Sequence, residues 1–400
     1  MPPPVPAPAH PPTERRTPWV QLRTFSYHPT LYPAMIRGAS PDATPGSLVA
    51  VYDKDGYPFG AGFYHPRARV PLRVLHHGPD AVTEQHLLDQ LDRAVALRHD
   101  VLRLPDHTDA YRVVHSDGDS LSGLVVDRFA DVLSVSVHSL GVFQRLPNWL
   151  DHLHRRLGTR HAVIEVDERA ARFEGIRRAG APPPPLQSVK IREHGIRHEV
   201  DFAEGHKTGF FCDQRDNRRR LTAFTRGARV LDLCCYTGGF ALAARIAGEA
   251  TEVTGVDLDE TAIARARRNA NLNQARIEWI HCDAFTWCRQ MQKNRERWDV
   301  VVLDPPKLVF DREDTDGGTK KYEDLNILGL SLVRPGGLFV TCSCSGMVDE
   351  DEFDRIVIKA AHRQGRRLQF LDRTGAAPDH PVLSTCPESR YLKVRWTRVL

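Results

Sequence analysis

The second half of this 400-residue chain alternates between apolar strands and amphipathic helices. From about Val189 to the C-terminus, strand-like runs such as ARVLDL, EVTGVDL and WDVVVLD are separated by helical patterns such as ETAIARARRNANLN. Strictly alternating strands and helices form parallel βαβ units with right-handed crossovers. The pattern therefore predicts a doubly wound, Rossmann-like α/β domain over residues 189–400, with a ligand site at the carboxyl edge of its sheet.

The N-terminal half follows different patterns, which predict two further domains. Between residues 19 and 79, short apolar runs such as SLVAVYD and VPLRVLHH alternate with turn signals, as is typical of a small β-barrel. From Thr83 the period becomes helical, and mixed strand and helix patterns follow, which predicts an α/β middle domain over residues 80–188. Residues 1–18 are rich in proline and lack apolar periodicity, so we expect a disordered tail. The Pro182–Pro185 run indicates a stiff connection at a domain boundary.

Composition restricts the function classes. Hydrophobic residues make up 41% of the chain and charged residues 26%, which is ordinary for a globular protein and excludes extensive disorder. No apolar run approaches the roughly 18 residues of a membrane-spanning helix, and the first residues lack the apolar core of a secretion signal. We therefore expect a cytoplasmic protein without membrane association. The net charge of +4 permits an acidic partner without requiring one.

All eight cysteines lie in the second half of the chain. No two of them form a CxxC pair, and no histidine cluster completes the ligand set of a zinc site, so we expect no metal. Reduced thiols are the expected state in a cytosolic domain. The strand end TCSCSG, which contains Cys342 and Cys344, is the candidate for thiol chemistry.

Aspartates follow four successive strands of the predicted sheet. Asp232 ends the first strand before a loop that contains Gly238, and Asp257, Asp283 and Asp304 end the next three. A single aspartate in such a place is often a helix N-cap, but four at successive carboxyl edges indicate a ligand site. The GxGxxG motif that brings a pyrophosphate onto a helix N-terminus is absent. The pattern predicts an adenosine-bearing cation, S-adenosylmethionine, with one carboxylate on its ribose hydroxyls and another on its adenine amino group.

The fifth strand places a thiol beside the Asp-Pro-Pro loop of the fourth. Carbon 5 of a pyrimidine is a poor nucleophile until a thiolate adds to carbon 6, and either Cys342 or Cys344 could supply that thiolate. Asp304 could hold the base through its N3 and amino edge as charge shifts on the ring. Lys307 is a candidate for the cation that favours the thiolate.

Several longer motifs together resemble one known family. The run KTGFFCDQRDNR at 207–218, the loop DLCCYTGGF, LDPPK, TCSCSG and the tail DHPVLSTCPESRYLK are similar to those of the bacterial large-subunit (23S) rRNA cytosine-5 methyltransferase family of the RlmI type. The resemblance covers almost the whole chain. It implies a class I methyltransferase domain that uses S-adenosylmethionine, a PUA-like RNA-binding barrel at the N-terminus, and ribosomal RNA as the partner. A homodimer is an open alternative to a monomer.

The resemblance also implies roles for individual residues. The constant part of the family's fifth-strand motif is S-C-S, so the nucleophile corresponds to Cys344, and Cys342 is the second choice. In the family's barrel His-Pro is usually followed by Trp, whereas Thr30 stands there in this chain. The positions that correspond to cofactor contacts are Gln214, Asp232, Tyr236, Gly238, Asp257, Asp283, Ala284 and Asp304.

Two other functions remain open from the residues alone. An RNA amino-group methyltransferase, for example one acting on N2 of guanine, also uses an Asp-Pro-Pro loop, but it usually has an aromatic residue where this chain has Lys307. A non-catalytic RNA-binding protein would use the barrel and basic side chains on phosphates. The arginines available for that purpose are Arg218, Arg219, Arg220, Arg265, Arg267 and Arg268. For any base chemistry we expect the target nucleotide to lie outside an intact duplex.

Overall fold

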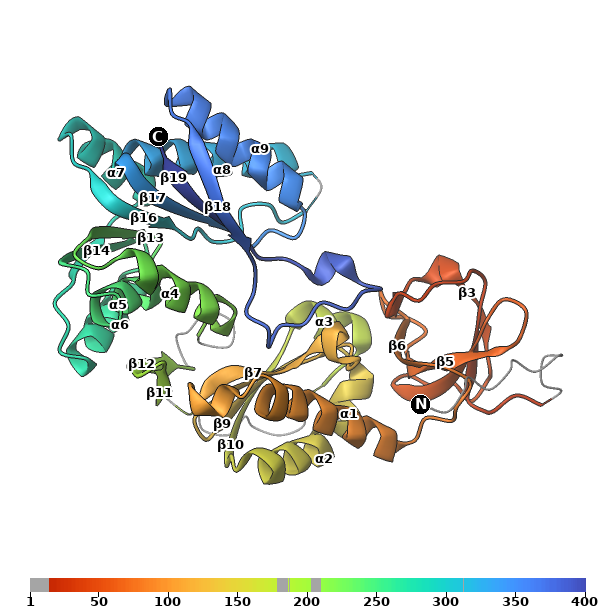
Figure 1. The fold of residues 1–400 in the computed structure, drawn as a ribbon. Coiled ribbons are helices and arrows are strands. Elements are labelled where there is room, and N and C mark those ends of the chain that lie inside the picture. The colour runs from red at the N-terminus through yellow and green to blue at the C-terminus, as the bar shows by residue number, and fades with distance from the viewer. Residues whose placement is uncertain (1–13, 178–185, 187, 203–209, 312) are drawn as a thin grey trace. The chain divides into compact units, whose positions relative to one another are not determined.

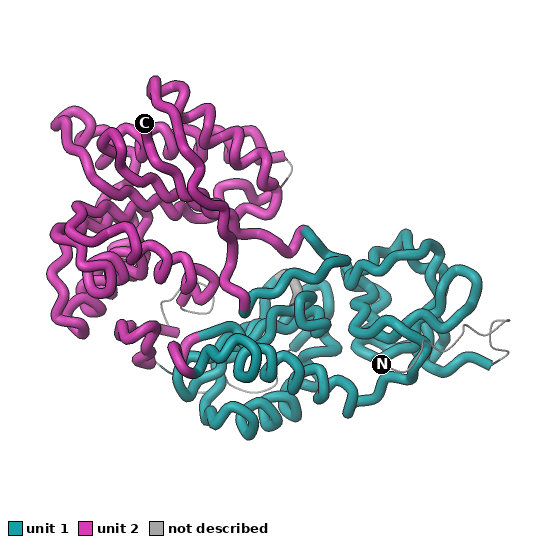
Figure 2. The backbone as a smooth tube through the Cα atoms, in the orientation of Figure 1, with its two compact units in different colours: residues 1–105, 111–186, 379–387 teal, residues 106–110, 187–378, 388–400 magenta. Residues whose placement is uncertain are grey.

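The computed structural model describes residues 14–177, 186, 188–202, 210–311 and 313–400. The chain divides into two compact units, shown in Figure 2. Unit 1 comprises residues 1–105, 111–186 and 379–387, and unit 2 comprises residues 106–110, 187–378 and 388–400. Most of the proline-rich tail, the Pro182–Pro185 run and the beginning of the KTGFF motif lie outside the described residues. No described helix is long and apolar enough to cross a membrane.

Unit 1 begins with a six-stranded sheet in the order β2-β6-β5-β4-β1-β3. Figure 1 labels β3, β5 and β6 of this sheet. The strands are β1 (Trp19–Leu22), β2 (Thr30–Leu31), β3 (Ile36–Ala39), β4 (Ser47–Tyr52), β5 (Pro58–Tyr64) and β6 (Leu72–His77). Their buried apolar side chains form one core. Strand β6 passes so close to β5 that a Cβ on Gly60 or Gly62 would lie 2.2 Å from a carbonyl oxygen of β6, which explains the glycines there.

The rest of unit 1 is an α/β part, whose four-stranded sheet has the order β10-β9-β8-β7. Its elements are α1 (Glu84–Ala96), β7 (Ala110–His115), β8 (Leu124–Phe129), β9 (Val132–Val137), α2 (Leu140–Leu157), β10 (His161–Val166) and α3 (Glu168–Glu174). Thr83 caps α1 by accepting a hydrogen bond from the backbone N–H of His86, as the sequence predicts. The late segment 379–387 also belongs to this unit, because Asp379 accepts hydrogen bonds from the backbone N–H of Arg112 and the guanidinium of Arg98.

Unit 2 contains a seven-stranded sheet in the order β15-β14-β13-β16-β17-β19-β18. The first five strands in this order are parallel, and the order reverses between β13 and β16. Such a reversal is the switch point at which ligands bind in open α/β sheets. The strands are β13 (Arg229–Leu233), β14 (Glu252–Asp257), β15 (Glu278–His281), β16 (Trp298–Leu303), β17 (Val333–Ser343), β18 (Leu368–Thr374) and β19 (Lys393–Val399).

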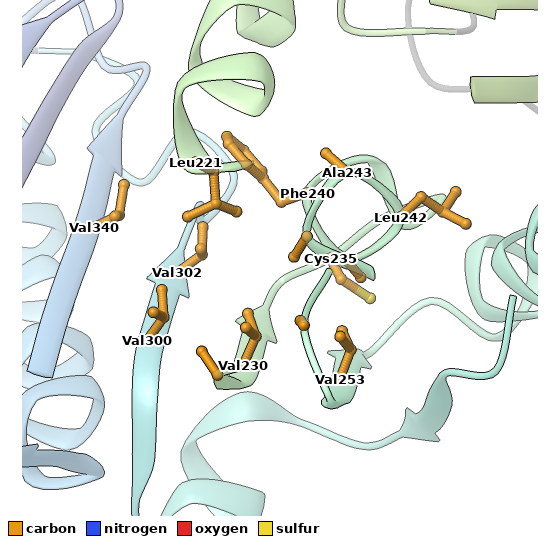
Figure 3. Close-up of a cluster of buried hydrophobic side chains, with 14 of the residues drawn as sticks. Leu221, Val230, Cys235, Phe240, Leu242, Ala243, Val253, Val300, Val302 and Val340 are labelled. Atoms are coloured by element: carbon orange, nitrogen blue, oxygen red, sulfur yellow. The ribbon is translucent and has the colours of Figure 1, made fainter. Parts of the chain in front are cut away.

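Helices cover both faces of this sheet, as a doubly wound fold requires. The helices are α4 (Arg215–Leu221), α5 (Gly239–Ile246), α6 (Glu260–Leu272), α7 (Ala284–Lys293), α8 (Thr315–Ser331) and α9 (Glu350–Arg363), and a hairpin of β11 (Ser188–Glu193) and β12 (Ile196–Asp201) precedes them. Figure 3 shows the core on one face, where Val230, Val300 and Val302 of the strands contact α5 side chains such as Phe240. A second core on the other face contains residues of α7, α8 and α9. The structure confirms the predicted α/β fold class.

The edge of the sheet differs from the prediction of parallel strands only. Strand β19 runs antiparallel to both β17 and β18, and β18 was not expected as a strand. A parallel pair needs a crossover, usually a helix, over the face of the sheet. The connection 375–392 contains no α-helix and includes the segment that belongs to unit 1, so β19 returns beside β18 in the opposite direction.

Candidate active site

A cavity of about 560 Å³ lies at the carboxyl edge of the parallel strands in unit 2. Residues that follow β13, β14, β15, β16 and β17 contribute to its wall. The predicted site residues in the wall are Gln214, Tyr236, Asp257, Asp283, Ala284, Asp304, Lys307 and Cys344. Aromatic and apolar side chains, including Phe211, Leu258 and Phe285, supply much of the remaining surface. An apolar cavity with a few converging polar groups is typical of a cofactor or substrate site.

The loop after β13 has an unusual backbone. Cys234, Tyr236 and Gly238 have φ angles of +60°, +49° and +84°. Left-handed conformations cost about 1–3 kcal/mol for residues other than glycine, so tertiary contacts must hold this loop. The Asp257 carboxylate accepts a hydrogen bond of 2.7 Å from the Tyr236 N–H, and the Cys235 N–H donates to the carbonyl of Val256. These hydrogen bonds hold the loop at the cavity, and its residues Cys234 to Thr237 line the wall.

Two of the predicted cofactor contacts do not line the cavity. Asp232 is fully buried, and one carboxylate oxygen accepts a hydrogen bond from the backbone N–H of Ala241 in α5. Its other oxygen has no hydrogen-bond partner within the described residues, and burial raises the pKa of Asp232 well above its ordinary value. A Cβ on Gly238 would lie 2.4 Å from the Trp279 ring, so this glycine is needed for packing, and its neighbour Gly239 lines the cavity instead.

Asp257 and Asp283 are brought to the same cavity from adjacent strands. Asp257 accepts from two backbone N–H groups, those of Tyr236 and Asp259. Asp283 caps α7 by accepting a hydrogen bond from the Thr286 N–H, which is the alternative role of an aspartate at a strand end. A carboxylate oxygen has more than one acceptor position, so these hydrogen bonds leave both side chains able to accept from ligand hydroxyl or amino groups.

Asp304 directly follows β16 and takes part in a network of hydrogen bonds. The Gln214 side-chain amide donates to Asp304 Oδ2 over 3.0 Å, and Asn217 donates in turn to the Gln214 carbonyl oxygen over 2.7 Å. Burial raises the pKa of Asp304 to about 7, and the nearby Asp213 carboxylate adds to this effect, although hydrogen bonds from Gln214 and Cys342 oppose it. Near neutral pH this side chain therefore exists both as an acid and as a carboxylate, in one orientation.

The two candidate thiols occupy different environments. Cys344 lines the cavity and is partly exposed. Cys342 has 0% exposure, lies outside the cavity wall and donates a hydrogen bond to Asp304. Burial, together with the Asp304 charge, raises the pKa of Cys342 well above its ordinary value. A nucleophile needs both access to substrate and thiolate character, so only Cys344 of these two has the required access.

The sequence predicts Lys307 as the cation beside the thiol, and the structure adds a second candidate. Lys307 is exposed in the cavity wall, with its Nζ 5.7 Å from the centroid of the Phe310 ring. Lys393 on β19 is buried, and its Nζ donates to the backbone carbonyls of Ser345 and Tyr391 over 2.6 and 2.8 Å.

The electrostatic environment of Lys393 connects it to the thiol. Burial lowers the pKa of Lys393 to about 8, while negative charge on Glu350 and Cys344 opposes this change. The lysine is mostly charged at neutral pH, and its charge favours the Cys344 thiolate. The tail motif DHPVLSTCPESRYLK ends at Lys393 but does not by itself indicate this role, because only the pairing of β19 with β17 brings the lysine to the strand end that carries the thiol.

We expect Lys393→Met to move the acidic limb of the pH profile of kcat/KM to higher pH by about one unit. The reason is that an opposite charge nearby favours the ionised form of a titrating group. Lys307→Met is the matched control and should leave that limb in place, since Lys307 is exposed and solvent screens its charge. An unshifted limb in the Lys393 variant would remove this role from Lys393, and a shifted limb in the Lys307 variant would assign it to Lys307.

The structure corrects the prediction that six arginines are available for phosphates. Arg218 is buried and makes two hydrogen bonds of 2.7 Å to the Glu193 carboxylate. Arg265 is 1% exposed and pairs with Asp201. Neither guanidinium is available to a phosphate, because each is buried and its charge is already paired with a carboxylate inside the protein. Arg218 instead lines the cavity, a position that the run of arginines in the sequence does not reveal.

Comparison with known proteins assigns the fold to a family. The sequence model of the S-adenosylmethionine-dependent methyltransferase family matches residues 154–395, and that of the PUA-like domain matches residues 23–77. The ribosomal RNA large subunit methyltransferase I of Shewanella frigidimarina is 34% identical over 398 residues, which cover 96% of each chain. The chain belongs to this methyltransferase family. The large subunit methyltransferase I of Photobacterium profundum is similar to it as well, with 35% identity over 95% of this chain and 94% of that one.

Two solved structures share the fold of this methyltransferase. A methyltransferase from Streptococcus mutans has a TM-score of 0.76 at 20% identity and covers 95% of this chain and 100% of its own. A methyltransferase in complex with S-adenosylhomocysteine has a TM-score of 0.75 at 21% identity over 88% and 91% of the two chains. Identities this low establish the likeness of the folds.

The cavity residues fit the cofactor of the family, S-adenosylmethionine. This molecule carries an ammonium and a sulfonium charge together with ribose hydroxyls and an adenine amino group. The cavity offers carboxylates from Asp213, Asp257 and Asp283, and Asp213 Oδ1 is buried without a hydrogen-bond partner in the described structure. A buried acceptor that lacks a donor favours a ligand that brings one. The apolar wall around Leu258 and Phe285 suits an adenine ring.

Proposed function

We propose that this large-subunit rRNA methyltransferase transfers the methyl group to carbon 5 of a cytosine through a covalent adduct with Cys344. The observation that carries the proposal is the presence of Cys344 and Asp304 in one cavity wall, directly after neighbouring strands of the sheet. Amino-group transfer needs no thiol, whereas carbon 5 does not react until a nucleophile has added to carbon 6. The exposed position after the two prolines holds Lys307, which supplies no aromatic face for a base.

Asp304 has the properties needed to hold a cytosine. In its acid form, which the raised pKa keeps available near neutral pH, the carboxyl group has one donor and one acceptor. The Watson–Crick edge of cytosine presents an acceptor at N3 and a donor at the N4 amino group, so the two edges are complementary. The hydrogen bond from Gln214, which Asn217 holds in place by donating to the Gln214 carbonyl oxygen, fixes the orientation of the carboxyl group before the base arrives.

Cys344 then acts as nucleophile and leaving group. Its thiolate forms a bond to carbon 6, and the electron pair of the 5,6 double bond moves toward carbon 5 and N3, where the Asp304 proton stabilises the charge. When bound, S-adenosylmethionine supplies the electrophilic methyl group. Loss of the carbon 5 proton to a base restores the double bond as the Cys344 thiolate leaves with the electron pair of the carbon–sulfur bond. Lys393 stabilises the thiolate at both stages.

Methyl transfer to rRNA from a strain that lacks this gene tests the proposal. The cofactor carries a labelled methyl group, and the modified nucleoside is identified by mass after digestion. We expect 5-methylcytidine in large-subunit rRNA. Label in an exocyclic amino group, such as that of N2-methylguanosine, would replace the proposal with amino-group transfer. A protein that binds the cofactor but labels no rRNA would also contradict it.

A further inference from the structure

An exposed group of aromatic rings lies on the six-stranded sheet of unit 1, the region that the sequence predicts as a barrel, outside the proposed catalytic cavity. Phe25 and Tyr27, in the loop between β1 and β2, are 55% and 49% exposed. Phe59 on β5 and His77 at the end of β6 support them from the sheet. We call these four residues the aromatic platform.

Ring contacts hold the platform together. The Phe25 and Tyr27 centroids are 4.8 Å apart, and Phe59 lies 5.2 Å from Phe25 and 5.5 Å from Tyr27. His77 is 5.2 Å from Tyr27 and 5.1 Å from Phe59, and it also forms a hydrogen bond with the Tyr27 backbone. Most of these contacts are edge to face, which keeps the rings in fixed directions. Two large aromatic side chains thus remain half exposed side by side on a rigid support, and a contiguous exposed apolar patch of this kind is typical of an interaction site.

A hollow of about 240 Å³ adjoins the platform through His77. His76 and His77 both line it, and His76 Nε2 and His77 Nδ1 are buried without a hydrogen-bond partner in the described structure. Burial lowers the pKa of both histidines, so their rings are neutral at pH 7 and can each donate or accept. Arg93 provides an exposed cation in the wall, while the carboxylate of Asp119 is already paired with Arg98.

We propose that the aromatic platform stacks an unpaired base of the substrate RNA, with the adjoining hollow taking the polar edge or phosphate of the neighbouring nucleotide. Unpaired bases stack on aromatic side chains, and this contact is the main mode by which proteins read single-stranded RNA. The charge agrees with an RNA occupant, because residues 19–79 contain six basic and three acidic side chains. The proposal rests on the proposed function, in which RNA is the substrate, and it assigns the barrel a contact with a nucleotide other than the methylated one.

The experiment measures RNA binding separately from chemistry. The full chain with Cys344→Ala is titrated with a fluorescent single-stranded RNA of mixed sequence, without cofactor, at two salt concentrations. In this background Phe25→Ala with Tyr27→Ala is expected to weaken binding by about 10- to 100-fold, as loss of base stacking does. The dependence on salt should stay unchanged, because stacking releases no counterions. Arg93→Ala should instead reduce the salt dependence.

Tyr32→Ala provides the matched control. Tyr32 is 48% exposed on the same barrel but makes no ring contact with the platform among the described residues, so its removal should leave RNA affinity unchanged. Phe25→Trp with Tyr27→Phe should retain binding, since both replacements keep a stacking surface. An RNA carrying 2-aminopurine should lose fluorescence on binding to the parent protein and recover it with the double alanine variant.

Equal affinities of the double alanine variant and the Tyr32 variant would overturn the proposal. So would unchanged RNA binding accompanied by lost binding to a ribosomal protein, which would make the platform a protein-docking surface. Failure of the proposed cytosine chemistry would be detected by a separate measurement, the identity of the nucleoside that the unmodified enzyme methylates. In that enzyme the platform variant should raise KM for rRNA at least 10-fold while kcat stays within about twofold, since the platform lies outside the catalytic cavity.

Discussion

Cys344→Ala is expected to lower methyl transfer by about 10⁴-fold or more, while Cys342→Ala keeps activity within about tenfold of the unmodified protein. Loss of a covalent nucleophile removes the pathway itself, and effects of this size are typical of such losses. Cys342 is fully buried and outside the cavity wall, so its replacement changes a hydrogen bond to Asp304 without removing a group that reaches substrate. The measurement is the single-turnover rate of label transfer to rRNA.

Covalent trapping provides an independent readout of the same prediction. With RNA that contains 5-fluorocytidine, the adduct cannot lose a proton from carbon 5, so the protein should stay attached to the RNA in a denaturing gel. The trapped complex should form with the unmodified protein and with Cys342→Ala but not with Cys344→Ala. Trapping by Cys344→Ala and not by Cys342→Ala would assign the nucleophile to Cys342, and retained transfer in both variants would reject the covalent mechanism.

Asp304→Asn is expected to lower methyl transfer by about 10³-fold and at the same time to stabilise the protein above neutral pH. The amide keeps a donor and an acceptor but cannot provide a proton to N3 as the adduct forms. Stability rises because folding raises the pKa of Asp304 from 3.8 to about 7. The folded protein therefore binds this proton more tightly than the unfolded chain does, and the stabilisation, complete below pH 4, is lost as the pH rises through 7.

The asparagine side chain does not titrate and loses no stabilisation as the pH rises. The stability of the Asp304→Asn variant relative to the unmodified protein should therefore increase with pH. Between pH 5 and pH 8 the free energy of unfolding of the variant should gain at most about 3 kcal/mol relative to the unmodified protein. Urea unfolding at the two pH values measures this difference. Asp351→Asn, at an exposed carboxylate on α9, is the control and should show no comparable change. A stability difference that is the same at both pH values would show that Asp304 is not held near the neutral form.

The catalytic hypothesis drawn from the sequence depends on residues at the ends of two neighbouring strands, Asp304 and Cys344. The structure places both residues in one cavity wall. The residues after β13 to β17 lie at one edge of the sheet because parallel strands all end on the same side. For that reason Asp257, Asp283, Asp304 and Cys344 could be named from their positions after apolar runs. The strand pattern alone does not distinguish Cys344 from Cys342. Successive residues of a strand point to opposite faces of the sheet, so two residues that are two positions apart are expected on the same face.

The sequence by itself determined the α/β class of unit 2, the helix cap at Thr83 and the set of residues that follow the strands, because these depend on local periodicity and on the chemistry of single side chains. Only the tertiary structure decided which of them reach the cavity. It placed Asp232 and Gly238 behind the wall and buried Arg218 in an ion pair. It also brought Lys393 to the thiol through an antiparallel strand. Burial and pairing depend on contacts between segments far apart in the chain, and a local pattern contains no information about them.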